Sequence, residues 1–229
     1  MHHLSFMTNL WPWLPRRRTA GLEATEREQA AAELHKLQLS LAPLMEEGEL
    51  RSLLVSSAAH FEGRTTLAVS LARTLVETAA RRVLLVDADT RRPALHRVFH
   101  CGRERGFAEV VRQKVALAEA IHRLTPEGLF LLPAGRPGWR WSDVFALEAL
   151  ERFVSEATGE FDLVLFDAAP LLLSAEALRL SRCVDGVLWI VLAGQTQGGV
   201  LRRAQHALER AQAKVLGVVI NNYRQAFEE

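Results

Sequence analysis

A short glycine-containing loop in the first half of the chain has the residue types to bind phosphate. Gly63-Arg-Thr-Thr66 follows an apolar run and leads into an amphipathic segment. In a phosphate-binding loop, backbone N–H groups and a helix N-terminus hold the phosphates, and a Ser or Thr hydroxyl binds Mg²⁺. The match is incomplete, because Ala58 stands at the first glycine position and Arg64 at the lysine position. By itself, the loop is equally consistent with an ordinary strand-to-helix turn.

Three aspartates that follow predicted strands point to the same chemistry. Asp87 and Asp89 come directly after the apolar run 83–86, and Asp167 ends the segment 161–167. Carboxylates suit Mg²⁺ ligation and can orient an attacking hydroxyl or water beside a nucleotide. Each aspartate could instead cap a helix or a turn. Their recurrence after separate strands, in a chain that also has the loop, favours a phosphate and metal site.

The elements that must position these side chains alternate in type. Apolar runs of strand length occur at 53–55, 83–86, 129–132, 163–166, 187–192 and 215–220, and helical patterns at 66–78, 143–155, 175–181 and 199–213. Strands that are apolar throughout and alternate with helices indicate an α/β fold with a doubly wound, mostly parallel sheet. Ligands in such a fold bind at the carboxyl ends of the strands. The loop and the aspartates lie at those ends.

Composition narrows the classes of partner and the number of domains. The chain has 229 residues, 49% hydrophobic and 24% charged, with a formal net charge of +1. This is ordinary globular composition, and the charge gives no bulk attraction to nucleic acid. Two cysteines are too few for a disulfide framework, which fits a reducing, cytoplasmic compartment. We expect a flexible tail over 1–21, a helical arm over 22–45 and one nucleotide-binding domain over 46–229.

The predicted tail combines aromatic and basic residues. Trp11 and Trp13 precede three consecutive arginines at 16–18. Such a segment could touch a membrane surface or a partner, or it could be a poorly ordered terminus. The longest strongly apolar run, 186–194, is far shorter than the roughly 18 residues that span a bilayer. We therefore expect a cytoplasmic protein, and we leave open a peripheral position at the inner face of the cell membrane.

Taken together, these segments resemble a known family. The segments 56–66, 83–99, 161–170 and 184–187 are similar to the cytoplasmic domain of bacterial tyrosine kinases that regulate capsule and exopolysaccharide synthesis, which are related to the MinD/ParA group of deviant P-loop ATPases. The resemblance implies ATP and Mg²⁺ as ligands and autophosphorylation on tyrosine as the activity. It implies nucleotide binding by Glu62, Gly63, Arg64, Thr65, Thr66 and Asn221, metal binding by Thr65, Asp87 and Asp167, and catalytic roles for Arg64, Asp87 and Asp89.

The chain departs from the family pattern beside the predicted site. Phe61 and Arg64 stand where the family has glycine and lysine. A bulky residue is costly at positive φ, and a planar guanidinium does not freely replace a compact ammonium at the phosphates. Ala168 replaces a threonine, and Glu176 stands where the family often has aspartate. Because the metal-side groups are retained, these changes describe a degenerate member of the family.

Two further departures concern regulation. Glu33, Lys36 and Leu39 occupy positions that in the family form a Glu-x-x-Arg-x-x-Arg motif for ring assembly, so the resemblance leaves homo-oligomerisation in doubt. The sequence has one tyrosine, Tyr223, where the family carries a C-terminal tyrosine cluster as the phosphate acceptor. Both changes favour a kinase-like protein over a kinase.

Three functional hypotheses follow from the residues and the resemblance. The first is an ATP-binding protein of exopolysaccharide synthesis or export whose kinase activity is weakened or lost, and which docks on a membrane-embedded polysaccharide co-polymerase. The second is an active Mg-ATP-dependent tyrosine kinase or ATPase that acts on a partner, with Arg64 reaching the phosphates. The third is a MinD/ParA-like membrane-positioning ATPase that uses the aromatic and basic N-terminal segment.

Overall fold

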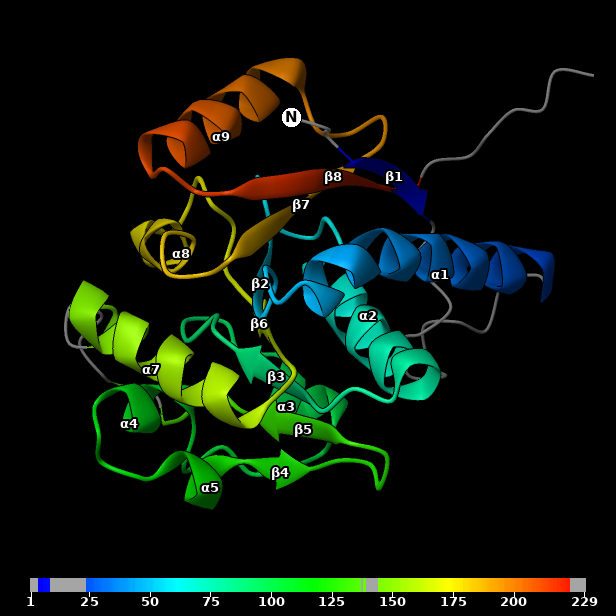
Figure 1. The fold of residues 1–229 in the computed structure, drawn as a ribbon. Helices are drawn as coiled ribbons and strands as arrows, with labels where there is room; N and C mark the ends of the chain where they lie inside the picture. The colour runs from blue at the N-terminus through cyan, green and yellow to red at the C-terminus, as the bar shows by residue number, and fades with distance from the viewer. Residues whose placement is uncertain (1–3, 9–23, 137, 139–143, 223–229) are drawn as a thin grey trace, which may run out of the picture.

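The chain folds around one eight-stranded sheet. The structure is a computed structural model and describes residues 4–8, 24–136, 138 and 144–222. The strand order is β1-β8-β7-β2-β6-β3-β5-β4 (Figure 1). The strands are β1 (Leu4–Thr8), β2 (Ser52–Ser57), β3 (Val83–Asp87), β4 (His122–Arg123), β5 (Leu129–Leu132), β6 (Leu163–Asp167), β7 (Gly186–Leu192) and β8 (Val215–Asn221). All neighbours pair in parallel except β4 and β5, which confirms the predicted fold class.

Helices cover both faces of the sheet. Figure 1 shows α1 and α2 on one side and α7, α8 and α9 on the other. The helices are α1 (Ala24–Glu46), α2 (Arg64–Ala79), α3 (Leu95–Val98), α4 (Phe107–Val111), α5 (Leu117–Ala120), α7 (Leu147–Glu160), α8 (Ala175–Leu180) and α9 (Gly198–Arg210). Each helix that follows a parallel strand crosses over the sheet, as a doubly wound topology requires.

The alternation of side chains along each strand divides the apolar interior into two cores. In β2, Leu53 and Val55 pack on the α1 and α2 side, whereas Leu54 packs on the α7 side, and all three are fully buried. Phe107 lies in the second core with its ring centroid 5.1 Å from that of Phe153. Because successive strand side chains point to opposite faces, a strand covered on both sides must be apolar throughout. The central strands are rigid supports for the loops at their carboxyl ends.

The N-terminal region differs from the predicted division into tail and arm. Residues 4–8, which we assigned to the flexible tail, form β1 and pair in parallel with β8 at the sheet edge. Strand β8 would otherwise present unpaired backbone groups there. Because β1 and β8 lie far apart in the sequence, no local pattern predicts this pairing. Helix α1 buries Leu34, Leu37 and Leu41 completely in the core shared with α2. The helix is thus integral to the domain, and residues 9–21 lie outside the described part of the chain.

Candidate functional site

The loop that follows β2 has the backbone shape of an anion-binding turn. Strand β2 ends at Ser57 and α2 begins at Arg64. Gly63 precedes the helix with φ of 97°, a conformation that favours glycine. Phe61 adopts φ of 66° and its side chain is 90% exposed. Thr65 and Thr66 lie in the first turn of α2, where free N–H groups and the helix dipole attract anions.

Two buried carboxylates lie side by side next to this loop. Asp87 ends β3, Asp167 ends β6, and the two residues are paired in register across the parallel strands. Their side chains therefore project from the same face of the sheet. The exposed fraction is 0% for Asp87 and 2% for Asp167. The register thus brings together two aspartates that are 80 positions apart in the sequence.

Burial and mutual repulsion favour the protonated forms of this pair. Burial raises the pKa of Asp87 well above its usual range, and the neighbouring Asp167 raises it further. Burial also raises the pKa of Asp167 to about 6, although the Arg64 guanidinium and the Thr65 hydroxyl oppose that shift. A pair of this kind is stabilised when a cation binds between or beside the carboxylates.

The polar atoms around the pair fit a magnesium ion. The Thr65 hydroxyl donates to Asp167 Oδ2 at 2.6 Å. Asp87 Oδ2 accepts the backbone N–H groups of Ala94 and Leu95, each at 2.9 Å. Among the described residues, Asp87 Oδ1 and Asp167 Oδ1 are buried without a hydrogen-bond partner. Buried carboxylate oxygens without a partner are unfavourable, so these two atoms are suitable ligands for a hard cation.

The same residues do not form a closed metal cage. Within the described ranges, no group of three or more His, Cys, Asp or Glu side chains has the arrangement of a metal site. Magnesium commonly uses one or two carboxylates and completes its shell with water and phosphate oxygens. The site therefore suits an ion that arrives with a phosphorylated ligand rather than one held by the protein alone.

Arg64 turns toward the carboxylates. Its Nη1 donates to the carbonyl oxygen of Ala168 and lies 3.7 Å from Asp89 Oδ2. The Arg64 side chain is only 11% exposed, and that of Asp89 is 8% exposed. Its positive charge also opposes the upward pKa shift of Asp167. The guanidinium thus offsets part of the negative charge of Asp89 and Asp167.

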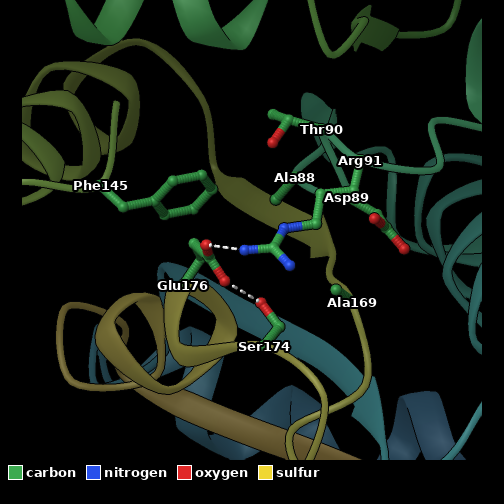
Figure 2. A pocket seen from close by; sticks show the side chains of 8 residues that line it. All are labelled: Ala88, Asp89, Thr90, Arg91, Phe145, Ala169, Ser174 and Glu176. Atoms are coloured by element: carbon green, nitrogen blue, oxygen red, sulfur yellow. Dashed lines mark hydrogen bonds and ion pairs between the residues drawn. The ribbon is translucent and has the colours of Figure 1, made fainter. Parts of the chain in front are cut away.

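Asp89 stands between Arg64 and a small pocket. Its Oδ1 accepts the N–H of Arg92 at 3.0 Å, while its Oδ2 faces Arg64. Figure 2 shows the pocket, with Asp89, Phe145, Arg91 and Glu176 around it; the remaining lining residues are Ala88, Thr90, Ala169 and Ser174. Of the two predicted catalytic aspartates, Asp89 is among the lining residues of this pocket, and its carboxylate is directed toward Arg64 and the Arg92 N–H.

An ion pair crosses the pocket from the turn after β3 to α8. Arg91 Nη2 lies 2.5 Å from Glu176 Oε1, and the Ser174 hydroxyl donates to Glu176 Oε2 at 2.7 Å (Figure 2). Burial raises the pKa of Glu176, but hydrogen bonds from Ser174 and Arg91 outweigh it and leave the pKa below its usual range. The sequence analysis identified Glu176 only as a residue that stands where the family often has aspartate. Ser174, the N-cap of α8, could have located it, because the N-cap puts Glu176 in the first turn of that helix.

Glu62 and Asn221, which the resemblance assigned to nucleotide binding, contact each other. Asn221 Nδ2 donates to the Glu62 carbonyl oxygen at 3.0 Å, and Asn221 Oδ1 accepts the N–H of Asn222 at 2.8 Å. The Glu62 side chain is 4% exposed and accepts hydrogen bonds from the Ala59 N–H and the Thr196 hydroxyl. In the structure, the hydrogen bonds of these two residues connect the loop to Thr196 and to the end of β8.

The remaining sequence-based expectations concern residues away from this site. Lys36 forms an exposed ion pair with Glu33 at 2.7 Å on α1, and Leu39 is 55% exposed. Tyr223 and the aromatic and basic segment of the predicted tail lie outside the described part of the chain. Among the described helices, none is long and apolar enough to cross a membrane.

Comparison with known proteins agrees with this geometry. Tyrosine-protein kinase YwqD of Bacillus subtilis (strain 168) is 28% identical over 173 residues, which is 76% of this chain and 73% of YwqD. Succinoglycan biosynthesis transport protein ExoP of Rhizobium meliloti (strain 1021) is 27% identical over 198 residues, which is 85% of this chain and 25% of ExoP. The solved kinase domain of Escherichia coli tyrosine kinase ETK superposes with a TM-score of 0.82 at 23% identity, over 98% of this chain and 93% of that domain.

The structural match shows a shared fold, and relatives of this chain are named as a tyrosine-protein kinase and as a succinoglycan biosynthesis transport protein. A family model described as the CobQ/CobB/MinD/ParA nucleotide binding domain matches residues 62–229. That range begins within the loop before α2 and includes all three aspartates. The chain therefore belongs to the CobQ/CobB/MinD/ParA nucleotide-binding domain family.

Proposed function

We propose that this protein binds ATP with Mg²⁺ at the loop before α2 and serves exopolysaccharide synthesis or export as a kinase-like module with weakened phosphoryl transfer. Support comes from its family, from relatives named as tyrosine kinases and as a succinoglycan transport protein, and from the altered charge arrangement around Arg64. The protein would act mainly by changing its contacts with a partner when nucleotide binds.

The residues present define how such a ligand would be held. Backbone N–H groups of the loop and the first turn of α2 would bind the phosphates. Thr65, Asp87 and Asp167 would hold Mg²⁺, which neutralises phosphate charge when bound. Asp89, which lines the pocket of Figure 2, would orient a hydroxyl group of an acceptor or a water molecule.

The contacts of Arg64 are the observation on which weakened activity rests. A loop lysine would place a compact ammonium at the β- and γ-phosphates. Arg64 instead donates to Ala168 O and faces Asp89. To reach a phosphate, the guanidinium would have to leave both partners in a largely buried setting, where loss of a charged hydrogen bond costs about 1.5–3 kcal/mol. This cost lowers affinity, and it also leaves Asp89 without its cation.

Substitution of Arg64 by lysine tests this proposal. We expect Arg64→Lys to bind Mg-ATP about tenfold more tightly by calorimetry, because 1.4 kcal/mol of relief corresponds to a factor of ten. Arg202→Lys, at an exposed position on α9, is the matched control and should leave affinity unchanged. Equal affinity in Arg64→Lys and the wild type would contradict the role assigned to Arg64. Strong phosphotyrosine labelling of the wild type with Mg-ATP would contradict weakened activity.

A second candidate function is a working ATPase or kinase that acts on another chain. The observation that favours it is the intact metal side of the site, where Asp87 and Asp167 each retain a buried oxygen without a partner among the described residues. In that case Asp89→Asn, with Arg64 left unchanged, should abolish the release of phosphate from ATP. An unchanged rate in Asp89→Asn would exclude this candidate.

The partner and the location are further proposals. The name of ExoP supports a membrane-embedded polysaccharide co-polymerase or export protein as the partner, at the cytoplasmic face of the membrane, with self-association as an additional property. Crosslinking in the native cell, followed by identification of the crosslinked protein, tests the partner. Recovery of crosslinked products that contain only soluble proteins would contradict it.

A further inference from the structure

A buried acid lies in a loop that is expected to bind anions. The Glu62 side chain is 4% exposed, and the residue directly precedes the glycine that starts the helix turn. A buried carboxylate is costly unless both oxygens are hydrogen-bonded, and its charge opposes the binding of phosphate. Its presence therefore requires a compensating role.

The contacts of Glu62 close the loop on itself and join it to two other backbone segments. Oε2 accepts the N–H of Ala59 at 2.8 Å, within the loop itself. Oε1 accepts the Thr196 hydroxyl, from the turn between β7 and α9. The carbonyl oxygen of Glu62 accepts Asn221 Nδ2 at 3.0 Å, from the last residue of β8. The partners on β7–α9 and β8 are 134 and 159 residues away in sequence.

Thr196 is itself fixed by the strand that precedes it. Its hydroxyl oxygen accepts the N–H of Leu192 at 3.0 Å while the hydroxyl hydrogen is donated to Glu62. One hydroxyl group therefore connects the end of β7 to the loop carboxylate. The position of the loop is set by a rigid central strand rather than by the local chain alone.

The loop needs external support because its own sequence is poorly suited to its shape. Ala58 stands at a position where a phosphate loop has glycine, and Phe61 holds φ of 66° with a side chain that is 90% exposed. An unfavourable backbone conformation persists only when surrounding contacts determine it. The exposed Phe61 ring contributes little packing, so hydrogen bonds supply that support. The Ser57 hydroxyl donates to the Ala59 carbonyl oxygen at 2.6 Å, and the contacts of Glu62 tie the loop to segments outside it.

We infer that Glu62 is a positioning residue: through Ala59, Thr196 and Asn221 it holds the backbone of residues 59–63 in the conformation that presents the N–H groups of residues 60–63 to phosphate. This inference rests on the proposed nucleotide-binding function. It also predicts that the turn between β7 and α9 is coupled to nucleotide binding, because Thr196 and the loop share one hydrogen bond.

The test compares three variants and one control by two independent measurements. Glu62→Ala removes the acceptor, Thr196→Val removes the donor but keeps the charge of Glu62, and Thr196→Ser keeps the hydroxyl. Glu77→Gln, at an exposed position on α2, controls for the loss of one negative charge. The first measurement is amide hydrogen exchange of residues 59–63 in the ligand-free protein. The second is the affinity for Mg-ADP by calorimetry, at a temperature at which thermal unfolding shows each variant to be folded.

We expect exchange at 59–63 to become about tenfold faster or more in Glu62→Ala and Thr196→Val, because a net hydrogen bond to a charged group is lost. Affinity for Mg-ADP should fall by about the same factor, since the disordered loop must be re-ordered on binding. Thr196→Ser and Glu77→Gln should match the wild type in both measurements. The loss in the double variant Glu62→Ala/Thr196→Val should be smaller than the sum of the two single losses, because both changes remove the contact between Glu62 and Thr196.

Four outcomes would overturn the inference. One is unchanged loop exchange in Thr196→Val. Another is tighter binding of Mg-ADP in Thr196→Val. Tighter binding in Glu62→Ala, beyond any change in Glu77→Gln, would likewise overturn the inference, because Glu62 would then act on the nucleotide through its charge alone. The fourth is additive losses in the double variant. If the wild type binds no nucleotide, the proposed function fails, whereas the exchange measurement still decides whether Glu62 positions the loop. If Glu62→Ala does not fold, the Thr196 pair carries the test.

Discussion

Replacing Asp167 by asparagine should stabilise the ligand-free protein at neutral and alkaline pH. The pKa of Asp167 is raised from 3.8 to about 6, chiefly by burial. Between these values the folded state keeps a proton that the unfolded state has released. The free energy of unfolding of the wild type therefore falls as pH rises from about 4 to about 6, and the loss persists above that range. Asparagine cannot ionise, so the variant lacks this loss.

The magnitude follows from the size of the shift. Each pKa unit corresponds to 1.36 kcal/mol, so a shift of about two units amounts to about 3 kcal/mol, as an upper value. Asp87 acts in the same direction, because burial, followed by repulsion from Asp167 across the paired strands, raises its pKa. Asparagine also offers an N–H₂ group where Asp167 has a buried oxygen with no partner in the described part of the chain, while its amide oxygen can still accept from Thr65.

Urea unfolding in the presence of a chelator, at several pH values between about 4 and about 8, measures this effect. The difference in free energy of unfolding between Asp167→Asn and the wild type should be near zero at the acid end and grow to about 1–3 kcal/mol at the alkaline end. Glu77→Gln, exposed on α2, should show no such growth. Adding Mg²⁺ and ADP should stabilise the wild type more than the variant.

The reasoning would be refuted by a variant that is less stable than the wild type at alkaline pH without metal. A constant difference across the pH range would also refute it, because the effect would then not come from ionisation. Equal stabilisation of both proteins by Mg-ADP would remove Asp167 from the set of metal ligands.

Two further substitutions, one in the loop before α2 and one at the opposite end of β2, are tested by the same unfolding measurement. Phe61→Gly should raise the free energy of unfolding by about 0.5–1 kcal/mol, because Phe61 holds φ of 66° and is 90% exposed; a loss of stability would show that the ring packs. Asp185→Ala should lower it by about 2–3 kcal/mol, since Asp185 Oδ2 accepts three hydrogen bonds, from the Arg51 N–H, the Ser52 N–H and the Ser52 hydroxyl. Asp185→Asn keeps an acceptor oxygen and should lose less; equal losses would contradict this explanation.

Arginine at position 64, where a phosphate loop has lysine, changes the electrostatics around the loop and the aspartates. A cation at this place has two sets of anions to choose from, the ligand phosphates and the aspartates of the protein. The planar guanidinium, with five donors, can contact a carbonyl and a carboxylate together, and it does so with Ala168 and Asp89. A compact ammonium has less reach toward both. The guanidinium of Arg64 therefore offsets part of the negative charge of Asp89 and Asp167.

The fold class could be predicted because each central strand carries its own signal. Strands β3 and β6 are apolar up to the aspartate that ends each of them, β7 is apolar along its length, and β2 is apolar at residues 53–55, since helices cover both faces of the sheet. Strand β1 was not predicted, because it is defined by backbone pairing with β8, which joins residues far apart in the chain. Helix α1 was predicted as a helix from its leucine spacing, but its membership of the core depends on contact with α2.

The sequence by itself determined the inventory of the site: a strand followed by a glycine turn, a threonine at the start of a helix, and aspartates after two other strands. These are local properties, because residue type and distance along the chain are enough to recognise them. Only the tertiary structure decided the pairings. The parallel register placed Asp87 beside Asp167, packing turned Arg64 toward Ala168 and Asp89, and the ends of β7 and β8 reached Glu62. Each of these contacts joins residues far apart in the chain, and each depends on burial, which sets both the charge state of an acid and the partners that it must find.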